Sequence, residues 1–331
     1  MSKIRPSKGA PYARIMGVGG YRPVRVVPNE VILETIDSSD EWIRSRSGIA
    51  TRHWASPEET VAAMSIEASG KAIADAGISA DQIGGVIVST VSHFKQTPAV
   101  ATEIADKLGT GKAAAFDISA GCAGFGYGLT LAKGMIVEGS AEYVLVIGVE
   151  RLSDLTDLQD RATAFLFGDG AGAVVVGPCD EPAIGPTVWG SEGDKSETIK
   201  QTVPWTEYDS SGKFPAITQE GQAVFRWAVF EMAKVAQQAL DAAGISPDDL
   251  DVFIPHQANM RIIDSMVKTL KLPDHVTVAR DVETTGNTSA ASIPLAMERL
   301  LATGQAKSGD TALVIGFGAG LVYAATVVTL P

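Results

Sequence analysis

An internal repeat constrains this 331-residue chain more than any other feature, because two related halves must pack in related ways. Ala-Gly-Ile-Ser occurs at 76–79 and again at 243–246, an offset of 167. Around both copies a helical pattern ends at a glycine, crosses a short acidic turn and enters an apolar strand. Leu-Val-Ile-Gly then occurs at 145–148 and 313–316, an offset of 168. The chain is therefore expected to consist of two similar halves.

A third pair of segments predicts where the halves differ. Gly-Asp-Gly-Ala-Gly at 168–172 and Gly-Phe-Gly-Ala-Gly at 316–320 are related by a smaller offset, 148. Aligning them implies about twenty extra residues in the first half, around 149–167. This insertion carries Arg161 and several acidic residues, so a loop with a role at a site or an interface is expected there.

Helical and strand patterns alternate through both halves, which favours a sheet covered by helices in each. Two such halves packed together predict a layered α/β/α/β/α arrangement around a pseudo-twofold axis. We place the first half at residues 1–178 and the second at 179–331. Equivalent strand ends then meet near the centre, where ligands tend to bind in α/β folds.

Composition argues against several classes of protein. A hydrophobic content of 45% with 20% charged residues supports a large core and argues against disorder. A net charge of −12 disfavours nucleic acid as a partner. Two cysteines are too few for a disulfide framework, and a reducing cytoplasm is the expected setting. The four histidines show no zinc-site spacing, so no metal site is expected.

Neither end of the chain indicates membrane insertion. Residues 1–14 are polar and lack the apolar core of a signal peptide. Residues 311–331 carry no charge, but glycines at 316, 318 and 320 divide them. The β-branched tail that follows favours two buried strands joined by a tight loop over a membrane-spanning helix.

Cys122 is the first candidate for chemistry. It lies among small residues, between an apolar strand that ends near Ile118 and a helical pattern over 125–136. The start of a helix favours the thiolate, and small neighbours leave space for a substrate thioester. On local grounds, a buried and inert cysteine is equally reasonable. Cys179 is interpreted as structural, because it lies in a polar turn beside two acids that oppose thiolate formation.

His256 and Asn287 are the second and third candidates. His256 opens a polar run after an apolar strand, and Asn287 precedes a helical pattern with Pro294 in its first turn. Each residue alone has an ordinary explanation, as a satisfied loop histidine or a helix cap.

The repeat links the three candidates. Ser89 ends a first-half strand, and the offset of 167 carries it onto His256. The offset of 168 carries Cys122 onto position 290, which is close to Asn287. Related strand-to-helix junctions therefore direct Cys122, His256 and Asn287 toward a common centre.

The two glycine-rich segments resemble dinucleotide-binding loops. Such loops open a helix, however, and the chain from Leu321 onward has the pattern of a strand. Nucleotide binding is therefore not expected. The loop at 316–320 can still offer free backbone N–H groups to an oxyanion.

Taken in order, these segments resemble β-ketoacyl-acyl-carrier-protein synthase III, a condensing enzyme of the thiolase-like fold. The resemblance extends over essentially the whole chain. It rests on Gly-Cys-Ala-Gly-Phe at 121–125, Phe-Gly-Asp-Gly-Ala-Gly at 167–172, Pro-His-Gln-Ala-Asn at 255–259, Gly-Asn-Thr-Ser-Ala-Ala-Ser at 286–292, Ser-Asp-Glu-Trp-Ile at 39–43 and Thr-Arg-His at 51–53.

The resemblance implies a five-layered thiolase-like homodimer that starts type II fatty-acid synthesis without a cofactor. Cys122 would take a short acyl group from acyl-CoA, with the backbone N–H groups of Cys122 and Ala319 as the oxyanion hole. Malonyl-acyl-carrier protein would then lose CO2, with His256 and Asn287 hydrogen-bonding the enolate. Attack on the acyl-Cys would give 3-oxoacyl-carrier protein.

The resemblance also implies binding roles. Trp42 and Arg161 would sandwich the adenine of CoA, and Thr97 and Phe317 would border the acyl pocket. The pantetheine route would follow Arg46, Gly221, Phe225, Asn259 and Arg261. Docking of the acidic carrier protein would use a basic patch of Arg226, Arg261 and Lys268.

Two positions depart from the family pattern. Ala319 stands where many members have glycine, but its expected role needs only a backbone N–H. Thr97 stands where straight-chain-specific members have phenylalanine, which the partner subunit contributes to the end of the acyl pocket. The smaller side chain should deepen that pocket, so branched starters such as isobutyryl-CoA are expected alongside acetyl-CoA.

Three rival functions share parts of this pattern. A papain-like cysteine hydrolase has the order Cys, His, Asn and a similar separation of its cysteine from its histidine. The duplicated αβ pattern is the wrong architecture for it. A related acyltransferase or ketosynthase of secondary metabolism keeps all three residues and is open on sequence grounds. A non-catalytic homologue that binds carrier protein fits an intact Cys/His/Asn set poorly.

Overall fold

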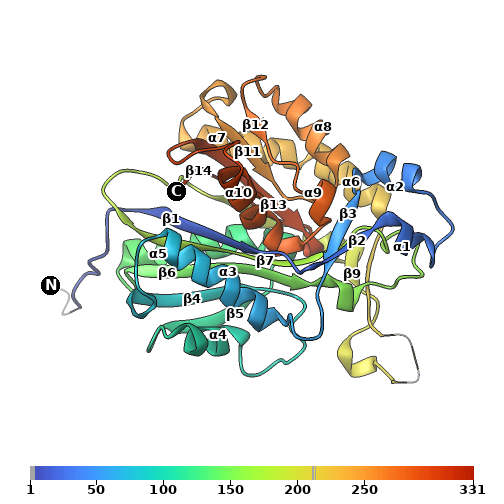
Figure 1. The fold of residues 1–331 in the computed structure, drawn as a ribbon. Helices are drawn as coiled ribbons and strands as arrows, with labels where there is room; N and C mark the ends of the chain where they lie inside the picture. The colour runs from blue at the N-terminus through green and yellow to red at the C-terminus, as the bar shows by residue number, and fades with distance from the viewer. Residues whose placement is uncertain (1–3, 211, 213) are drawn as a thin grey trace.

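The computed structural model describes residues 4–331 apart from 211 and 213, so the first three residues of the polar N-terminal stretch lie outside it. Two five-stranded sheets form its centre (Figure 1). The first sheet has the spatial order β1 (Tyr12–Tyr21), β7 (Asp169–Cys179), β6 (Tyr143–Arg151), β4 (Ile83–Ser89) and β5 (Ala114–Ile118). The second has the order β8 (Val188–Ser191), β14 (Val322–Thr329), β13 (Thr311–Gly318), β11 (Val252–Pro255) and β12 (Thr277–Val278).

The two sheets have the same topology. In each, two antiparallel contacts are followed by two parallel contacts, so β1, β7, β6, β4 and β5 correspond in turn to β8, β14, β13, β11 and β12. The predicted repeat is therefore confirmed at the level of strand order.

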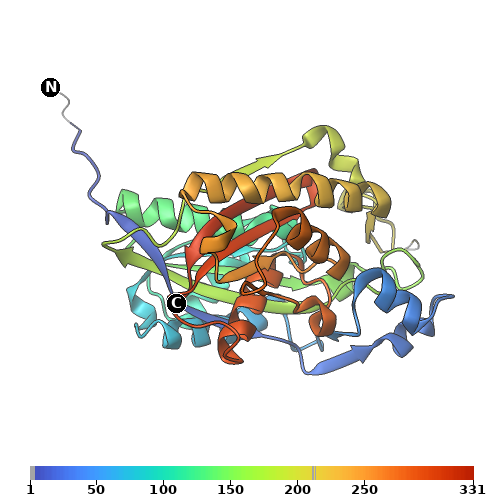
Figure 2. The same cartoon turned by 90° about the horizontal axis from the view of Figure 1, so that it is seen from above.

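Helices complete the five layers. The outer face of the first sheet packs on α3 (Val61–Asp75) and α4 (Val100–Leu108). Between the sheets lie α5 (Gly124–Glu138) and α10 (Ser292–Ala302). The outer face of the second sheet packs on α7 (Met232–Ala243) and α8 (Met260–Leu270), and Figure 2 shows α6 (Gly221–Phe230) and α7 running one after the other across the molecule. This arrangement confirms the predicted α/β/α/β/α class.

Strand β6 shows why the sequence forms buried strands. Its Val144 and Val146 pack with the central helices, whereas Leu145 and Ile147 pack with the outer helices. All four side chains are fully buried. A strand covered on both faces has no polar alternation, which explains the continuous apolar run.

The two copies of Ala-Gly-Ile-Ser form the same local structure. Each outer helix is followed by a glycine in the left-handed region, Gly77 after α3 and Gly244 after α7. A serine capping box then opens a short 3₁₀ turn, at Ser79 before β4 and at Ser246 before β11. In each half, a left-handed glycine and a serine capping box therefore connect the outer helix to a buried strand.

The insertion in the first half is smaller than the sequence predicts. Gly148 of β6 pairs with Gly172 of β7, whereas the equivalent Gly316 of β13 pairs with Ala324 of β14. The first pair is more widely spaced along the chain than the second, but by fewer than the twenty positions expected. Segment 168–172 is therefore not the counterpart of 316–320, because the former leads into β7 whereas the latter leaves β13.

Two excursions flank the sheets. The first contains β2 (Arg25–Pro28), α1 (Asn29–Leu33), α2 (Asp40–Ser47) and β3 (Thr51–Trp54), and it packs near α9 (Val282–Thr285). The second lies between β8 and α6 and contains β9 (Ile199–Gln201) and β10 (Ile217–Gln219). Short 3₁₀ turns lie at Ala80–Gln82, Gly121–Ala123, Leu152–Leu155, Gly193–Thr198, Trp205–Glu207, Pro247–Asp249, Ser289–Ala291 and Ala319–Leu321.

The uncharged C-terminal segment forms β13 and β14, which pair as an antiparallel hairpin, as predicted. Among the described residues, no helix combines the length and apolar character needed to cross a bilayer. The predicted boundary between residues 178 and 179 falls at the last residues of β7, and as a domain boundary it stays a prediction.

Candidate active site

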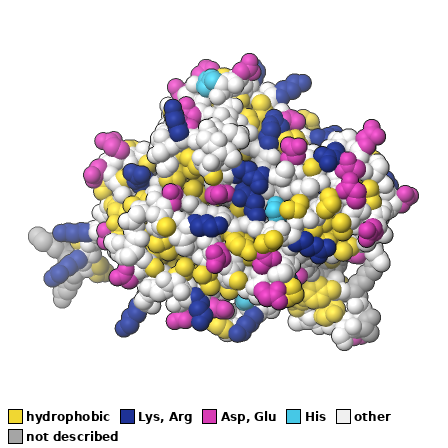
Figure 3. Space-filling view, in the orientation of Figure 1, with side chains coloured by type: hydrophobic (Ala, Val, Ile, Leu, Met, Phe, Trp, Pro, Cys, Tyr) yellow, Lys and Arg dark blue, Asp and Glu magenta, His cyan; other side chains and the backbone are white. Residues whose placement is uncertain are grey.

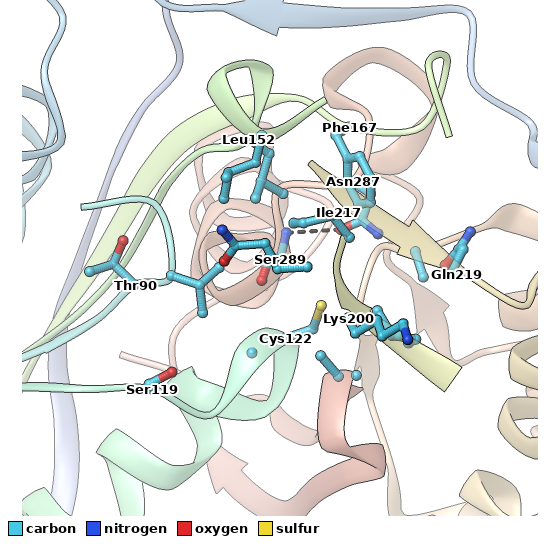
Figure 4. Close-up of a pocket in the computed structure, with 18 of the residues that line it drawn as sticks. Thr90, Ser119, Cys122, Leu152, Phe167, Lys200, Ile217, Gln219, Asn287 and Ser289 are labelled. Carbon is cyan, nitrogen blue, oxygen red and sulfur yellow. Dashed lines mark hydrogen bonds between the residues drawn. The ribbon is translucent and has the colours of Figure 1, made fainter. Parts of the chain in front are cut away.

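A cavity of ≈ 520 Å³ lies where the two halves meet. Cys122, His256, Asn287, Phe317 and Ala319 all line it. Figure 4 shows the Cys122 sulfur directed into the space between Ser289 and the side chains of Lys200 and Ile217. The structure thus brings together the three side chains that the repeat directs to a common centre.

Glycines make this convergence possible. A Cβ atom on Gly148 would lie 2.1 Å from the Ala290 carbonyl oxygen, and one on Gly316 would lie 2.8 Å from the Cys122 carbonyl oxygen. Residues 148 and 316 are equivalent in the repeat, as are 122 and 290. Each half therefore offers a glycine in its central strand to the strand–helix junction of the other half.

Cys122 is held in the tight 3₁₀ turn Gly121–Ala123, which continues into α5. A Cβ atom on Gly318 would lie 2.8 Å from the Cys122 sulfur, so only glycine leaves room for the thiol at that position. Ala319 follows Gly318 in the turn after β13, which places its backbone beside the cysteine.

The thiol is in contact with the cavity but is otherwise surrounded by protein. This burial raises the pKa of Cys122 to about 12, although the Ser289 hydroxyl and the cysteine's own backbone N–H act in the opposite direction. The effect of burial thus exceeds the preference for the thiolate that the helix start provides, and the neutral thiol is the favoured resting form.

His256 follows β11 and is neutral. Its Nδ1 lies 2.7 Å from the Ser292 hydroxyl oxygen, and its ring meets the Phe317 ring edge-on with centroids 5.4 Å apart. Burial lowers the pKa of His256 to about 3. If Ser292 donates to Nδ1, the proton of the neutral ring is on Nε2, which then serves as a donor.

Asn287 is fixed through its backbone and its side chain. Its N–H donates to the Leu166 carbonyl at 2.8 Å, and its carbonyl accepts from the Gly168 N–H at 3.0 Å. Its Oδ1 accepts from the Ser289 N–H at 2.9 Å, drawn as the dashed line in Figure 4. The oxygen is thus occupied, and the Nδ2 amide group is the part left to act as a donor.

The connection between β6 and β7 contributes to this site. Its last residues hold the Asn287 backbone, and its Leu152, Leu155 and Phe167 side chains line the cavity. The longer connection of the first half therefore carries the role at a site that its sequence predicts.

The second excursion closes the opposite wall. Lys200, Ile217 and Gln219 line the cavity from β9 and β10. At the rim, the exposed rings of Phe94, Trp205 and Phe214 pack on one another with centroids 5.0–5.6 Å apart. Hydrophobic side chains accordingly gather at the lower right of the space-filling view, over the lobe that carries β9 (Figure 3).

The residues predicted to bind CoA lie around the cavity but do not line it. Arg161 stacks directly on the Trp42 ring, 5.0 Å from its centroid, so adenine cannot enter between them without their separation. Arg261 lies over the Phe225 ring at 4.9 Å, and Arg46 lies near Trp42. Asn259 caps α8 through the Arg261 N–H, and its Nδ2 donates to the Arg46 carbonyl at 3.0 Å.

The other predicted residues lie at the surface. Gly221 and Arg226 are exposed on α6, and Lys268 is exposed on α8, which packs against α6. Thr97 is exposed and is not part of the cavity wall.

Sequence reasoning left three polar residues of the site without a role. Ser289 and Ser292 lie inside the segment 286–292, in which only Asn287 was a candidate. Glu150 is fully buried at the end of β6. An acid that directly follows the apolar run 143–149 is the signal that would have identified it. Within the described part of the chain, no three His, Cys, Asp or Glu side chains are grouped as metal ligands.

Comparison with known proteins agrees with this geometry. The family profiles of 3-oxoacyl-[acyl-carrier-protein] synthase III and of its C-terminal part match residues 116–193 and 240–330. The chain is 90% identical to β-ketoacyl-[acyl-carrier-protein] synthase III of Streptomyces glaucescens over all of both chains. It is 55% identical to the mycobacterial β-ketoacyl-[acyl-carrier-protein] synthase III of Mycobacterium marinum, over 100% of this chain and 99% of the other.

Solved structures show the same fold. The priming β-ketosynthase of the R1128 polyketide pathway superposes with a TM-score of 0.97 at 45% identity, covering 100% of this chain and 99% of the other. The 3-oxoacyl-[acyl-carrier-protein] synthase III of Aquifex aeolicus superposes with a TM-score of 0.88 at 37% identity, covering 96% and 99%. This chain belongs to the β-ketoacyl-[acyl-carrier-protein] synthase III family of thiolase-fold condensing acyltransferases.

Proposed function

We propose that this condensing enzyme carries a short acyl group on Cys122 and joins it to the malonyl group of malonyl-acyl-carrier protein. The observation that carries the proposal is the meeting of Cys122, His256 and Asn287 in one cavity built from both halves of the repeat. The substrates are acyl-CoA and malonyl-acyl-carrier protein, and the proposal includes no cofactor.

In the first half-reaction the Cys122 sulfur attacks the acyl-CoA thioester, and CoA leaves. The backbone N–H groups of Cys122 and Ala319 form the proposed oxyanion hole. Two observations support this assignment. The Cys122 N–H faces its own sulfur and acts to lower the thiol pKa against the effect of burial. A Cβ atom on Gly318 would meet the sulfur at 2.8 Å, and one on Gly121 would meet the Ala319 nitrogen at 3.4 Å, so both N–H groups belong to the turns around the thiol. Fixed backbone donors stabilise a tetrahedral oxyanion without reorganisation.

In the second half-reaction malonyl-acyl-carrier protein loses CO2, and His256 and Asn287 donate hydrogen bonds to the enolate oxygen. The neutral state of His256 and the occupied Oδ1 of Asn287 support two neutral donors at this position. The enolate carbon then attacks the acyl-Cys carbonyl, the bond to Cys122 breaks, and 3-oxoacyl-carrier protein leaves.

For the starter unit we propose short straight and branched acyl groups, including acetyl and isobutyryl. Thr97 lies outside the cavity of its own subunit, so its proposed place at the end of the acyl pocket requires a homodimer. Phe317 borders the cavity from its own chain. A threonine in place of an aromatic ring leaves space for a branched chain at that end.

For the second substrate we propose docking on Arg226, Arg261 and Lys268, which are exposed on the neighbouring helices α6 and α8. Pantetheine would pass between these helices and α2, once Trp42 and Arg161 separate to admit the CoA adenine. Both cysteines are free thiols, which fits the proposed cytoplasmic setting.

A second candidate function is priming of polyketide synthesis on the same scaffold. It is favoured by the TM-score of 0.97 to the priming β-ketosynthase of the R1128 pathway. Condensation rates with carrier proteins of fatty-acid and polyketide type distinguish the two functions, because the chemistry at Cys122 is the same in both.

The proposal is tested by assaying 3-oxoacyl-carrier protein formed from malonyl-acyl-carrier protein and acetyl-, butyryl- or isobutyryl-CoA. We expect product with acetyl- and isobutyryl-CoA, none with Cys122→Ala, and a selective loss of isobutyryl-CoA kcat/KM in Thr97→Phe. Lys268→Glu should raise KM for the carrier protein while acylation by acetyl-CoA is unchanged. Absence of product from the unmodified protein with every starter would refute the condensing function, and rejection of isobutyryl-CoA alone would refute the starter assignment.

A further inference from the structure

Glu150 is a buried acid that the steps above do not use. It lies at the end of β6 with no exposed surface. Its Oε2 accepts hydrogen bonds from the Ser92 hydroxyl at 2.6 Å, the Val91 N–H at 3.1 Å and the Thr90 hydroxyl at 3.3 Å. No donor meets hydrogen-bond geometry at its other oxygen, Oε1, among the residues that the structure describes. A buried carboxyl oxygen without a donor is costly and therefore calls for an explanation.

Ser289 lies between this carboxyl group and the nucleophile. Its side chain is 4% exposed and lines the cavity beside Cys122. The turn Ser289–Ala291 packs against both the turn Gly121–Ala123, which holds Cys122, and strand β6, which holds Glu150. Burial raises the pKa of Glu150 and of Cys122, and contact with the Ser289 hydroxyl acts in the opposite direction on both. Ser289 thus contacts both the cysteine that lines the cavity and the buried acid.

The backbone of Ser289 is strained, and the repeat shows what an unstrained residue would be. Ser289 has a φ of 48°, in the left-handed region, and its counterpart in the first half is Gly121, also with a φ of 48°. Glycine adopts this conformation freely, whereas another residue costs about 1–2 kcal/mol. Position 289 of the second half therefore retains a serine hydroxyl in the cavity, although the backbone conformation there favours glycine.

We propose that Ser289 and Glu150 form a proton relay for Cys122, an inference that rests on the proposed condensation at this residue. As the Cys122 sulfur bonds to the thioester carbon, its proton passes to the Ser289 oxygen, and the Ser289 hydroxyl proton passes to Glu150. The bond from that carbon to the CoA sulfur breaks, and the CoA thiolate takes a proton from solvent.

The relay runs in reverse during condensation. The enolate carbon bonds to the acyl carbon, the bond from the acyl carbon to the Cys122 sulfur breaks, and the thiolate regains its proton from Glu150 through Ser289. Decarboxylative condensation consumes one proton overall, and this is the proton that the CoA thiolate took up. Glu150 therefore stores the cysteine proton for the lifetime of the acyl-enzyme.

Burial supports this assignment. It raises the pKa of Glu150 to about 7 and that of Cys122 to about 12. The acid can thus gain and lose a proton near neutral pH, while the thiol does not ionise there unaided. Because the pKa of the thiol exceeds that of the acid, proton transfer from Cys122 to Glu150 is unfavourable by itself. The proton therefore moves as the bond forms at sulfur. The hydrogen-bond donors to Glu150 are neutral, and the guanidinium of the adjacent Arg151 is directed to Asp154.

The test is single-turnover acylation of Cys122 by acetyl-CoA from mildly acidic to mildly alkaline pH, in Glu150→Gln, Ser289→Ala and Ser289→Gly. Glutamine keeps the shape of Glu150, and glycine relieves the Ser289 backbone, so a folding defect cannot account for both. We expect acylation of the unmodified protein to rise through an inflection near pH 7 and to be about 10²-fold faster than in all three variants, which lack that inflection. Ser69→Ala, which removes a buried hydroxyl without a partner in the described structure of α3, should match the unmodified protein.

Decarboxylation of malonyl-acyl-carrier protein without a starter isolates the His256 and Asn287 step, and it should survive in the three variants. A neutral-pH inflection and an undiminished acylation rate in Glu150→Gln would overturn the relay. If the unmodified protein itself is not acylated, the proposed function fails and not the relay alone.

Discussion

The Nδ1 atom of His256 lies 2.7 Å from the hydroxyl oxygen of Ser292, which joins the end of β11 to the first residue of α10. The Gln257 N–H also approaches the same oxygen, at 3.4 Å. Ser292 therefore orients the imidazole, and a Ser292 hydroxyl that donates to Nδ1 leaves the ring proton on Nε2.

Replacing Ser292 by alanine tests this role. Loss of one neutral hydrogen bond, worth about 1 kcal/mol, and of the fixed tautomer should slow decarboxylation of malonyl-acyl-carrier protein by roughly tenfold. Acylation of Cys122 should be unchanged, because His256 does not act in that step. Ser65→Ala, which removes a buried hydroxyl bonded to the Val61 carbonyl within α3, is the matched control. Equal slowing of both half-reactions in Ser292→Ala would indicate a structural role instead.

Asn287→Asp distinguishes the role of the side-chain oxygen of Asn287 from the role of its amide donor. Aspartate keeps the oxygen that accepts from the Ser289 N–H but places an acceptor where the amide donates. Because one donor to a developing oxyanion contributes about 3–4 kcal/mol, we expect decarboxylation to fall by about 10²–10³-fold while acylation persists. Near-normal decarboxylation by this variant would show that the amide does not contact the enolate.

The close packing around Gly148 predicts that alanine substitutions at Gly148 and at Gly134 change the stability of the fold in opposite directions. Gly148→Ala would place a Cβ atom 2.1 Å from the Ala290 carbonyl oxygen, a contact with backbone that cannot yield without moving the junction. We expect a loss of several kcal/mol and a large fall in Tm. Gly134→Ala, in α5 with open space around it, should raise stability by about 0.5–1 kcal/mol. A Tm for Gly148→Ala equal to that of the unmodified protein would contradict the packing described.

His256 also predicts how stability depends on pH. Burial lowers its pKa to about 3 from an ordinary 6.5, so below pH 6.5 the unfolded chain binds a proton that the folded chain does not. The contribution of the neutral His256 to the free energy of unfolding is therefore complete above pH 6.5 and is lost as pH falls toward 3. Glu150, whose pKa is raised to about 7 from 4.5, acts in the opposite direction, since its contribution is lost as pH rises from 4.5 to 7.

A comparison with His256→Gln isolates the histidine. From about pH 7.5 to about pH 5, the free energy of unfolding of the unmodified protein should fall by about 2 kcal/mol more than that of the variant, as measured by urea titration at both pH values. Identical changes in the free energy of unfolding of the two proteins would mean that His256 takes up a proton as readily in the folded protein as in the unfolded chain.

The sequence predicts the layers and the meeting of Cys122, His256 and Asn287, because these follow from the repeat and from hydrophobic periodicity. It overestimates the length of the insertion, because Gly-Xaa-Gly-Ala-Gly at 168–172 and at 316–320 are not equivalent segments. The first lies at the beginning of strand β7, and the second lies at the end of strand β13. The sequence shows that Cys122 lies at a helix start, which favours the thiolate, but it does not show the burial that raises the pKa of Cys122.

The hydroxyl groups of Ser289 and Ser292 show the same limit. Both lie within a segment that the sequence marks as polar and small, yet their partners Cys122, Glu150 and His256 come from three other segments of the chain. Contacts of this kind depend on side-chain direction at a tight junction, which periodicity does not encode.

The central claim is that Cys122 carries the acyl group, and peptide mapping by mass spectrometry after incubation with acetyl-CoA alone tests it most directly. We predict one acetyl group on the peptide that contains Cys122, the same adduct in Cys179→Ala, and none in Cys122→Ala. An adduct on Cys179, or acylation that persists undiminished in Cys122→Ala, would contradict the account.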